Sequence, residues 1–233
     1  MTERYMPNMT KNQVELIRSW HDESYQRQKA CLPERIWFMG LDLTIGPEVF
    51  SPSTDNETGD SYHEAIEAEV KPGERVLDMG TGSGVSGILA ARKGARVVAV
   101  DINPQAIECA RQNADRNGVA DKITFAVSDI FDEVDGDFDL VVFDPPFRWF
   151  KPRDLLEAAS TDEDYRGLTR FITEVKYRLR PSGRVLLNFG TSADIDYLHG
   201  LIDNAGFQQE TTQYGELTKS GFTCRYYIIR LTA

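Results

Sequence analysis

Short apolar runs alternate with longer amphipathic segments from position 75 onward, and this alternation predicts strands and helices in turn. Several of the runs are almost continuously apolar, so we expect those strands to be buried on both faces. Repeated strand–helix units of this kind favour a doubly wound parallel sheet. The expected strands are 75–79, 96–100, 123–127, 138–143 and 185–189, and the expected helices are 85–93, 104–117, 162–179 and 193–204.

The two ends of the chain depart from this alternation. Near the C-terminus, 207–213 and 224–231 have the pattern of an antiparallel pair of strands, which would close one side of the sheet. Near the N-terminus, Thr10 and Gln13 have the spacing of a helix capping box. The apolar stripe that follows them predicts a helix that ends near position 30.

A hairpin and a short helix are expected between these parts. Apolar positions in 35–52 predict two short strands with a turn at Gly46-Pro47, and 61–70 predicts a short helix. We therefore divide the chain into an N-terminal helix and hairpin extension, 1–50, and a main domain, 51–233.

A glycine-rich turn follows the first expected parallel strand and is the first candidate ligand site. It reads Asp78-Met79-Gly80-Thr81-Gly82-Ser83-Gly84 and leads into a helix. Glycine permits positive φ and a close approach of the backbone to a ligand, and the amides at a helix start attract a negative group. Dinucleotide-binding folds use a similar pattern, so the turn alone leaves the ligand open.

Acidic residues follow the next two expected strands. Asp101 ends the second strand, where an acid can accept hydrogen bonds from ribose hydroxyls. Asp129 follows the third strand and can accept a hydrogen bond from an adenine amino group, with Ile130 and Phe131 beside the ring. In a doubly wound sheet these strand ends lie along one edge, where ligands bind.

This set of residues resembles that of class I S-adenosylmethionine-dependent methyltransferases, and the similarity covers 36–231. The resemblance implies a Rossmann-like, mostly parallel seven-stranded sheet with an antiparallel C-terminal strand, and S-adenosylmethionine as the cofactor. A carboxylate at Asp78 agrees with this cofactor, because it would repel a pyrophosphate and attract an amino group and a sulfonium. The implied cofactor-binding residues are Asp78, Gly80, Thr81, Gly82, Gly84, Asp101, Ile102, Asn103, Asp129, Ile130, Thr58 and Asp144.

A narrower resemblance is to the release-factor glutamine methyltransferases and their relatives. The segments Asp101-Ile102-Asn103-Pro104 and Val49-Phe50-Ser51-Pro52 are typical of that group. The resemblance implies that the acidic and threonine-rich loop after Pro52 lies over the cofactor. Those enzymes usually carry Asn-Pro-Pro-Tyr where this chain has Asp-Pro-Pro-Phe, and they carry a larger N-terminal helical domain. The loop residues concerned are Thr54, Asp55, Glu57 and Thr58.

The fourth expected strand ends in Asp144-Pro145-Pro146-Phe147, the candidate catalytic residues. Amide and aromatic amino nitrogens are poor nucleophiles, because their lone pairs are delocalised. Asp144 and the backbone carbonyl of Pro145 can accept the two NH₂ hydrogens and free the lone pair. The prolines stiffen the turn, and Phe147 can stack on a planar group. The tetrapeptide therefore favours N-methylation.

Asp-Pro-Pro-Phe followed by Arg148 also resembles enzymes that methylate guanine-N2 in small-subunit ribosomal RNA. Asp-Pro-Pro with an aromatic residue is found in adenine-N6 methyltransferases as well. The residues after Arg148, Trp149, Phe150, Lys151 and Arg153, are interpreted as a lip for a base or a peptide. A basic run then follows, which is either a solvated face or a track for RNA. Its members are Arg166, Arg170, Lys176, Arg178, Arg180 and Arg184.

Composition narrows the choice of acceptor. The formal net charge of −11 disfavours nonspecific nucleic-acid binding, which needs a basic face.

The three cysteines and three histidines have no metal-ligand spacing, and no apolar run reaches membrane length. We therefore expect a cytoplasmic protein without a metal or a membrane partner.

The sequence as a whole predicts an S-adenosylmethionine-dependent N-methyltransferase that acts on an amide or other planar nitrogen of a protein, peptide or small metabolite. The alternative is methylation of an exocyclic amine of an RNA or DNA base, guanine-N2 or adenine-N6. A non-catalytic cofactor-binding scaffold and a dinucleotide oxidoreductase are the remaining alternatives. The sequence leaves the oligomeric state open.

Overall fold

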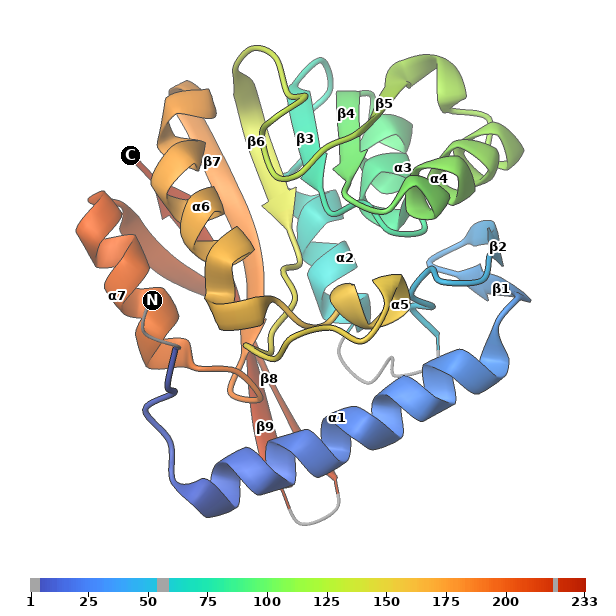
Figure 1. The fold of residues 1–233 in the computed structure, drawn as a ribbon. Coiled ribbons are helices and arrows are strands. Elements are labelled where there is room, and N and C mark those ends of the chain that lie inside the picture. The colour runs from blue at the N-terminus through green and yellow to red at the C-terminus, as the bar shows by residue number, and fades with distance from the viewer. Residues whose placement is uncertain (1–4, 54–58, 220–221) are drawn as a thin grey trace.

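The computed structural model describes residues 5–53, 59–219 and 222–233, and its centre is a seven-stranded sheet (Figure 1). The strand order is β5-β4-β3-β6-β7-β9-β8. Within the described ranges, β9 is the strand that runs against its neighbours on both sides. This confirms the predicted doubly wound, mostly parallel sheet. The strands are β3 (Arg75–Met79), β4 (Arg96–Asp101), β5 (Ile123–Val127), β6 (Phe138–Phe143), β7 (Leu179–Gly190), β8 (Gln208–Lys219) and β9 (Phe222–Thr232).

Helices cover both faces of the sheet and bury two separate apolar clusters (Figure 1). One cluster lies under α2 (Gly59–Glu69), α3 (Val85–Arg92) and α4 (Pro104–Arg116), and it holds Ile66, Ile88 and Ala106. The other lies under α6 (Arg166–Val175) and α7 (Ile195–Ala205), and it holds Phe171 and Leu198. Two filled faces explain why β6 is apolar along almost its whole length.

The N-terminal hairpin has a different turn from the predicted one. Its strands are β1 (Glu34–Phe38) and β2 (Leu41–Ile45), and the turn lies at Met39-Gly40 rather than at Gly46-Pro47. Both turn residues have positive φ, 50° and 68°, as a two-residue hairpin turn requires. Methionine is an unusual residue there, so the composition of the turn did not reveal it.

The hairpin packs against the main domain. The amide side chain of Asn113 on α4 accepts a hydrogen bond from the Thr44 N–H at 2.9 Å and donates one to the Thr44 carbonyl at 3.2 Å. This contact joins the hairpin to the main domain. The predicted division of the chain at position 50 stays a prediction.

The helix predicted at 162–179 is interrupted, and this expectation was wrong in its extent. Asp164 and Tyr165 adopt left-handed conformations, with φ of 56° and 54°, so α6 begins only at Arg166. Asp162 stabilises the break, because its carboxylate accepts hydrogen bonds from the N–H groups of Gly167 and Leu168. Short 3-10 turns flank α6 at Glu163–Tyr165 and Lys176–Arg178.

A long helix, α1 (Lys11–Cys31), lies across the carboxyl ends of the strands (Figure 1). Thr10 and Gln13 form the predicted capping box at its start. The side-chain amide of Gln28 bonds to both the N–H and the carbonyl of Ser51, each at 2.9 Å. A shorter helix, α5 (Leu155–Ala158), lies between α1 and the sheet. Within the described ranges, no helix has both the length and the apolar character needed to cross a membrane.

Gly84 is required where α3 begins beside α4. Its φ is 91°, and an added Cβ would lie 3.0 Å from the Ala110 Cβ. We expect Gly84→Ala to lower the free energy of unfolding by about 2–4 kcal/mol, from backbone strain plus overpacking. Gly118→Ala is the control, because Gly118 has φ of 69° and open space around it. Equal losses in urea titrations of both variants would contradict the close-packing argument.

Candidate active site

The strand ends open into a cleft of about 610 Å³ beneath α1, a size typical of small-molecule sites. It lies where neighbouring strands β3 and β6 connect to opposite sides of the sheet, the usual ligand position in this architecture. Twelve of the candidate cofactor-binding and catalytic residues line it. They are Gly80, Thr81, Gly82, Asp101, Ile102, Asn103, Asp129, Ile130, Asp144, Pro145, Pro146 and Phe147.

Asp78 lies below the glycine-rich loop and is not among the cleft-lining residues. Its carboxylate accepts hydrogen bonds from the Thr81 hydroxyl at 2.6 Å and the Gly87 N–H at 2.9 Å. Burial raises the pKa of Asp78 to about 6 against these two hydrogen bonds. Through these contacts Asp78 holds the glycine-rich loop in place. The predicted contact of Asp78 with a cofactor amino group stays a prediction.

Gly84 is also outside the cleft lining, at the start of α3. The loop glycines that line the cleft, Gly80 and Gly82, have φ of 67° and 53°. These left-handed conformations turn the backbone of the loop into the cleft. At Gly80 and Gly82 the loop therefore offers backbone rather than side chains to a ligand.

Asp101 is partly exposed to the cleft and is held by two backbone groups. One carboxylate oxygen accepts from the Gly82 N–H and the other from the Asn103 N–H, both at 2.9 Å. Burial raises the pKa of Asp101, and these hydrogen bonds oppose the rise. Each oxygen retains a lone pair that can accept a hydroxyl.

Asn103 connects this strand end to the segment after the hairpin. It caps α4 by accepting from the Gln105 N–H, and its amide donates to the Glu48 carbonyl at 2.7 Å. Glu48 itself has φ of 59° and lines the cleft with Val49 and Phe50. This contact holds the hairpin exit at the rim of the cleft.

Asp129 is exposed at the end of β5, and Ile130 beside it has φ of 51°. Both line the cleft, as the sequence predicted. Phe131 was expected to flank a bound ring, and this expectation was wrong. It is 2% exposed and stacks on Phe171 in the core, with ring centroids 5.7 Å apart.

Asp144 stands at the end of β6 with its carboxylate open to the cleft. One carboxylate oxygen accepts a hydrogen bond of 3.0 Å from the side-chain amide of Asn188 on β7. Desolvation by the surrounding protein raises the pKa of Asp144 to about 7, while Asn188 and the charge of Arg148 act in the opposite direction. The site thus holds a carboxylate that changes charge near neutral pH.

Phe147 lies half-buried at the far side of the tetrapeptide and is held by two other rings. Its centroid is 5.3 Å from that of Phe189 and 6.2 Å from that of Tyr226. The Phe147 carbonyl accepts a hydrogen bond from the Tyr165 hydroxyl at 2.8 Å. These contacts fix the turn that carries Asp144.

The predicted lip after Phe147 is wrong in most of its members. Trp149 and Phe150 are buried, and their rings pack against each other at 4.9 Å. Arg153 is engaged by carboxylates of Asp22 and Glu157. Lys151 is exposed and lines the cleft, in agreement with the prediction.

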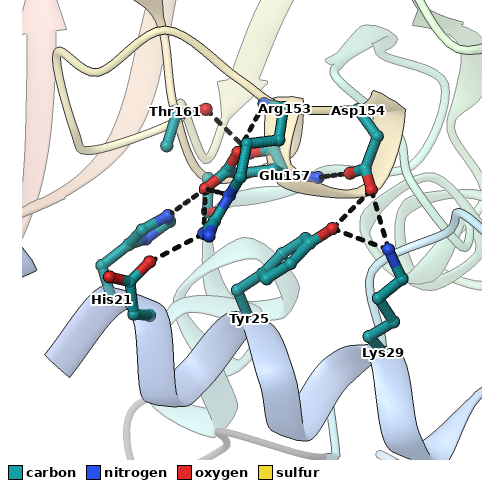
Figure 2. Close-up of polar contacts among 9 residues, drawn as sticks. His21, Tyr25, Lys29, Arg153, Asp154, Glu157 and Thr161 are labelled. Carbon is teal, nitrogen blue, oxygen red and sulfur yellow. Dashed lines mark hydrogen bonds and ion pairs between the residues drawn. The ribbon is translucent and has the colours of Figure 1, made fainter. Parts of the chain in front are cut away.

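Polar contacts join α1 to Arg153, Asp154 and Glu157, as Figure 2 shows. His21 bonds to the buried Glu157 carboxylate at 2.8 Å, and the Arg153 Nε donates to it at 2.8 Å. One turn further along α1, the Tyr25 hydroxyl donates to the Asp154 carboxylate. Helix α1 therefore forms a fixed roof, and its residues Trp20 and Ser24 line the cleft.

Glu157 is the central group of this fastening. Although burial acts to raise the pKa of Glu157, hydrogen bonds from Arg153 and His21 hold it below its ordinary value. We expect Glu157→Ala to lower the free energy of unfolding by about 2–3 kcal/mol, because both partners lose their acceptor while Arg153 can still reach water. Glu23→Ala on the exposed face of α1 is the control, with an expected change below about 0.5 kcal/mol. Equal urea midpoints for wild type and Glu157→Ala would contradict this role.

The basic run is mostly occupied by contacts within the protein. Arg170 pairs with Asp132 and Glu174, and Arg180 pairs with Asp139. Arg184 lies between Glu69 and Glu74. Lys176 contacts the carbonyls that end α7, and Arg178 lies over the Phe131 ring. Arg166 is exposed and lines the cleft.

Several cleft residues were missed from the sequence. Trp20 and Ser24 come from α1, Asn188 from β7 and Tyr226 from β9. No local motif marks them, because tertiary packing alone brings them to the cleft. Thr54, Asp55, Glu57 and Thr58 lie outside the described residues. Among the residues that are described, no group of three or more His, Cys, Asp and Glu side chains could hold a metal ion.

Comparisons with known proteins agree with this geometry. A family model for the methyltransferase small domain matches residues 41–214. A putative protein N5-glutamine methyltransferase of Methanocaldococcus jannaschii is 38% identical over 109 residues, which cover 46% of this chain and 52% of that protein. A ribosomal protein L11 methyltransferase of Burkholderia cenocepacia is 38% identical over 128 residues, covering 54% and 37%. The chain therefore spans about half or less of these curated relatives.

Solved structures show the same fold at lower identity. The ribosomal protein L11 methylase of Lactobacillus delbrueckii subsp. bulgaricus aligns with a TM-score of 0.57 and 22% identity, covering 79% of this chain and 82% of that one. The tRNA m1G37 methyltransferase of M. jannaschii aligns with a TM-score of 0.58 and 21% identity, covering 84% and 55%. These neighbours establish the architecture.

Proposed function

This chain belongs to the methyltransferase small domain family, whose members generally use S-adenosylmethionine, and we propose that it uses this cofactor to methylate an amide or other planar nitrogen of a protein, peptide or small metabolite. The observation that carries the proposal is the position of Asp144. Its carboxylate opens into the same cleft as the glycine-rich loop and Asp101. One cleft can thus hold a methyl donor and a nitrogen acceptor side by side.

The strand-end residues fit the cofactor. Asp101 has lone pairs left for two ribose hydroxyls after accepting its two backbone N–H groups. Asp129 and Ile130 lie at the next strand end, where they would bind the adenine. The turns at Gly80 and Gly82 would leave room for the methionyl part. When bound, the cofactor supplies an electrophilic methyl carbon.

The tetrapeptide would prepare the nitrogen. Asn188 engages one oxygen of Asp144, so the carboxylate is oriented before an acceptor arrives. Asp144 and the Pro145 carbonyl would then accept the two NH₂ hydrogens, and the nitrogen lone pair would point at the methyl carbon. Phe147 offers a face for the planar group. Alignment of the two reactants supplies much of the rate in such a site.

Asp144 would also receive the proton that the nitrogen loses. A base acts best when its pKa lies near the working pH, and the pKa of Asp144 is raised to about 7 by desolvation. The ionised carboxylate would therefore accept the hydrogen bond first and the proton afterwards.

A nucleic-acid base is the second candidate acceptor, favoured by Asp-Pro-Pro-Phe. Two observations weigh against it. The net charge is −11, and most of the basic run is engaged by carboxylates or carbonyls of the protein. Arg166 and Lys151 are exposed cations at the cleft that could face a phosphate.

Methyl-labelled S-adenosylmethionine and cell extract test the proposal. The extract is divided into an untreated, a nuclease-treated, a protease-treated and an ultrafiltered portion before the enzyme is added. We expect labelling that survives nuclease. It should be lost after protease treatment if the acceptor is a protein or peptide, and after ultrafiltration if the acceptor is a small molecule. Label that disappears with nuclease would support the base acceptor instead, and no enzyme-dependent label in any portion would contradict methyl transfer.

A further inference from the structure

Arg148 is a buried cation on the acceptor side of the cleft, directly after the tetrapeptide. It is 8% exposed and lines the cleft. Its guanidinium carbon lies 4.9 Å from the centre of the Trp20 ring and 5.8 Å from that of Phe147. Trp20 belongs to the roof and Phe147 to the proposed acceptor platform, so the cation stands between the two.

The backbone of Arg148 is fixed on both sides. Its N–H donates to the Ser160 carbonyl at 3.2 Å, and its carbonyl accepts from the Asp162 N–H at 2.7 Å. A β-bridge to Thr161 accompanies these bonds. The guanidinium is therefore carried on a rigid segment, which is the condition for selective recognition.

The charge of Arg148 reaches the groups around the proposed acceptor position. It opposes, together with Asn188, the desolvation that raises the pKa of Asp144, and it adds to the desolvation that lowers the pKa of His21. Among several smaller contributions, it also acts to lower the pKa of Tyr226. Arg148 thus places a positive charge on the acceptor side of the cleft, in a protein whose net charge is −11.

From this placement we propose that Arg148 binds an anionic group of the methyl acceptor, so that the acceptor is a small molecule carrying a carboxylate or a phosphate near its planar nitrogen. Arginine suits both groups, because its planar fork pairs with two oxygens at once. The inference rests on the proposed function for the identity of the ligand as acceptor. In this arrangement Arg148 determines specificity, and Asp144 binds the nitrogen.

The roof supports a small acceptor. Helix α1 is fastened through His21, Tyr25 and Gln28, and Trp20 on the same helix lines the cleft beside Arg148. A small acceptor can occupy the cleft while these contacts stay in place. A small anion needs only the cleft of about 610 Å³.

Four small probes test the anion subsite without any methyl transfer. Benzoate, phenyl phosphate, benzamide and benzyl alcohol are titrated by calorimetry into the full-length protein saturated with S-adenosylhomocysteine. We expect at least one anion to bind about tenfold more tightly than the neutral probes, from a charge-assisted bidentate pair. Comparing benzoate with phenyl phosphate distinguishes a carboxylate acceptor from a phosphate acceptor.

Variants connect this preference to Arg148. Arg148→Met should bind anionic and neutral probes equally, and Arg148→Lys should retain a reduced preference because the charge remains. Arg96→Met is the control, since Arg96 is exposed at the opposite end of β4. A preference that persists in both Arg148 variants, or that is absent from the wild type, would overturn the proposal. Because the readout is binding, it stays informative even if the transfer assay fails.

Discussion

Replacing Asp144 by alanine is expected to reduce methyl-transfer turnover by about 10²–10³-fold, the loss typical when a group that stabilises a transition state is removed. The nitrogen would then lose the acceptor that frees its lone pair and receives its proton. Affinity for S-adenosylmethionine should change by less than about threefold, because the expected effect belongs to the chemical step. Single-turnover rates with labelled cofactor and calorimetric titrations measure the two quantities separately.

Asp135→Ala is the matched control, because Asp135 is an exposed carboxylate outside the cleft-lining set. It should retain the wild-type rate. A turnover of Asp144→Ala within about threefold of wild type would show that the carboxylate does not act on the nitrogen.

The rate should also depend on the charge of Asp144. Desolvation raises its pKa to about 7, so the active carboxylate form is lost as the pH falls below that value. Turnover should therefore rise with pH through about 7 and then level off. Asn188→Ala removes a hydrogen bond that favours the ionised form, so the rise should move to higher pH. A pH–rate profile with no inflection in this range would contradict the assignment.

Replacing Asp101 by alanine is expected to weaken S-adenosylmethionine binding by about 100-fold, because hydrogen bonds to a charged acceptor contribute about 1.5–3 kcal/mol each. The variant also releases the N–H groups of Gly82 and Asn103, which the carboxylate now holds. Both effects weaken the binding of the ribose. Calorimetry with S-adenosylmethionine measures the loss directly.

Two further variants separate the causes. Asp101→Asn keeps one oxygen acceptor and should lose less affinity than the alanine variant. Asp115→Ala, on the exposed face of α4, is the control and should bind as wild type does. Wild-type affinity in Asp101→Ala would place the ribose elsewhere.

The parallel core was predictable because each of its strands is an apolar run. β6 and the central part of β7 are buried almost throughout, and their apolar sequences predict that burial. The hairpin turn at Met39-Gly40 was not predictable, since methionine is an unusual residue at a position with positive φ. The break before α6 depends on Asp162 bonding to Gly167 and Leu168, which the helical pattern of 162–179 does not reveal.

The cleft likewise combines residues that local sequence patterns predicted with residues that only tertiary packing brings there. Asp101, Asp129 and Asp144 were found because each follows a predicted strand, and parallel strands end at one edge. Phe131 was misplaced, because it is adjacent to cleft residues in sequence but turns into the core. Asn188 and Trp20 reach the cleft from β7 and α1, and only the tertiary fold brings them there.

A crystal structure with S-adenosylhomocysteine bound tests the central claim most directly. The account predicts the ribose on Asp101, the adenine beside Asp129 and Ile130, and the sulfur facing the Asp144 carboxylate across the space for a nitrogen. A nucleoside bound away from Asp101, or a sulfur turned away from Asp144, would contradict it.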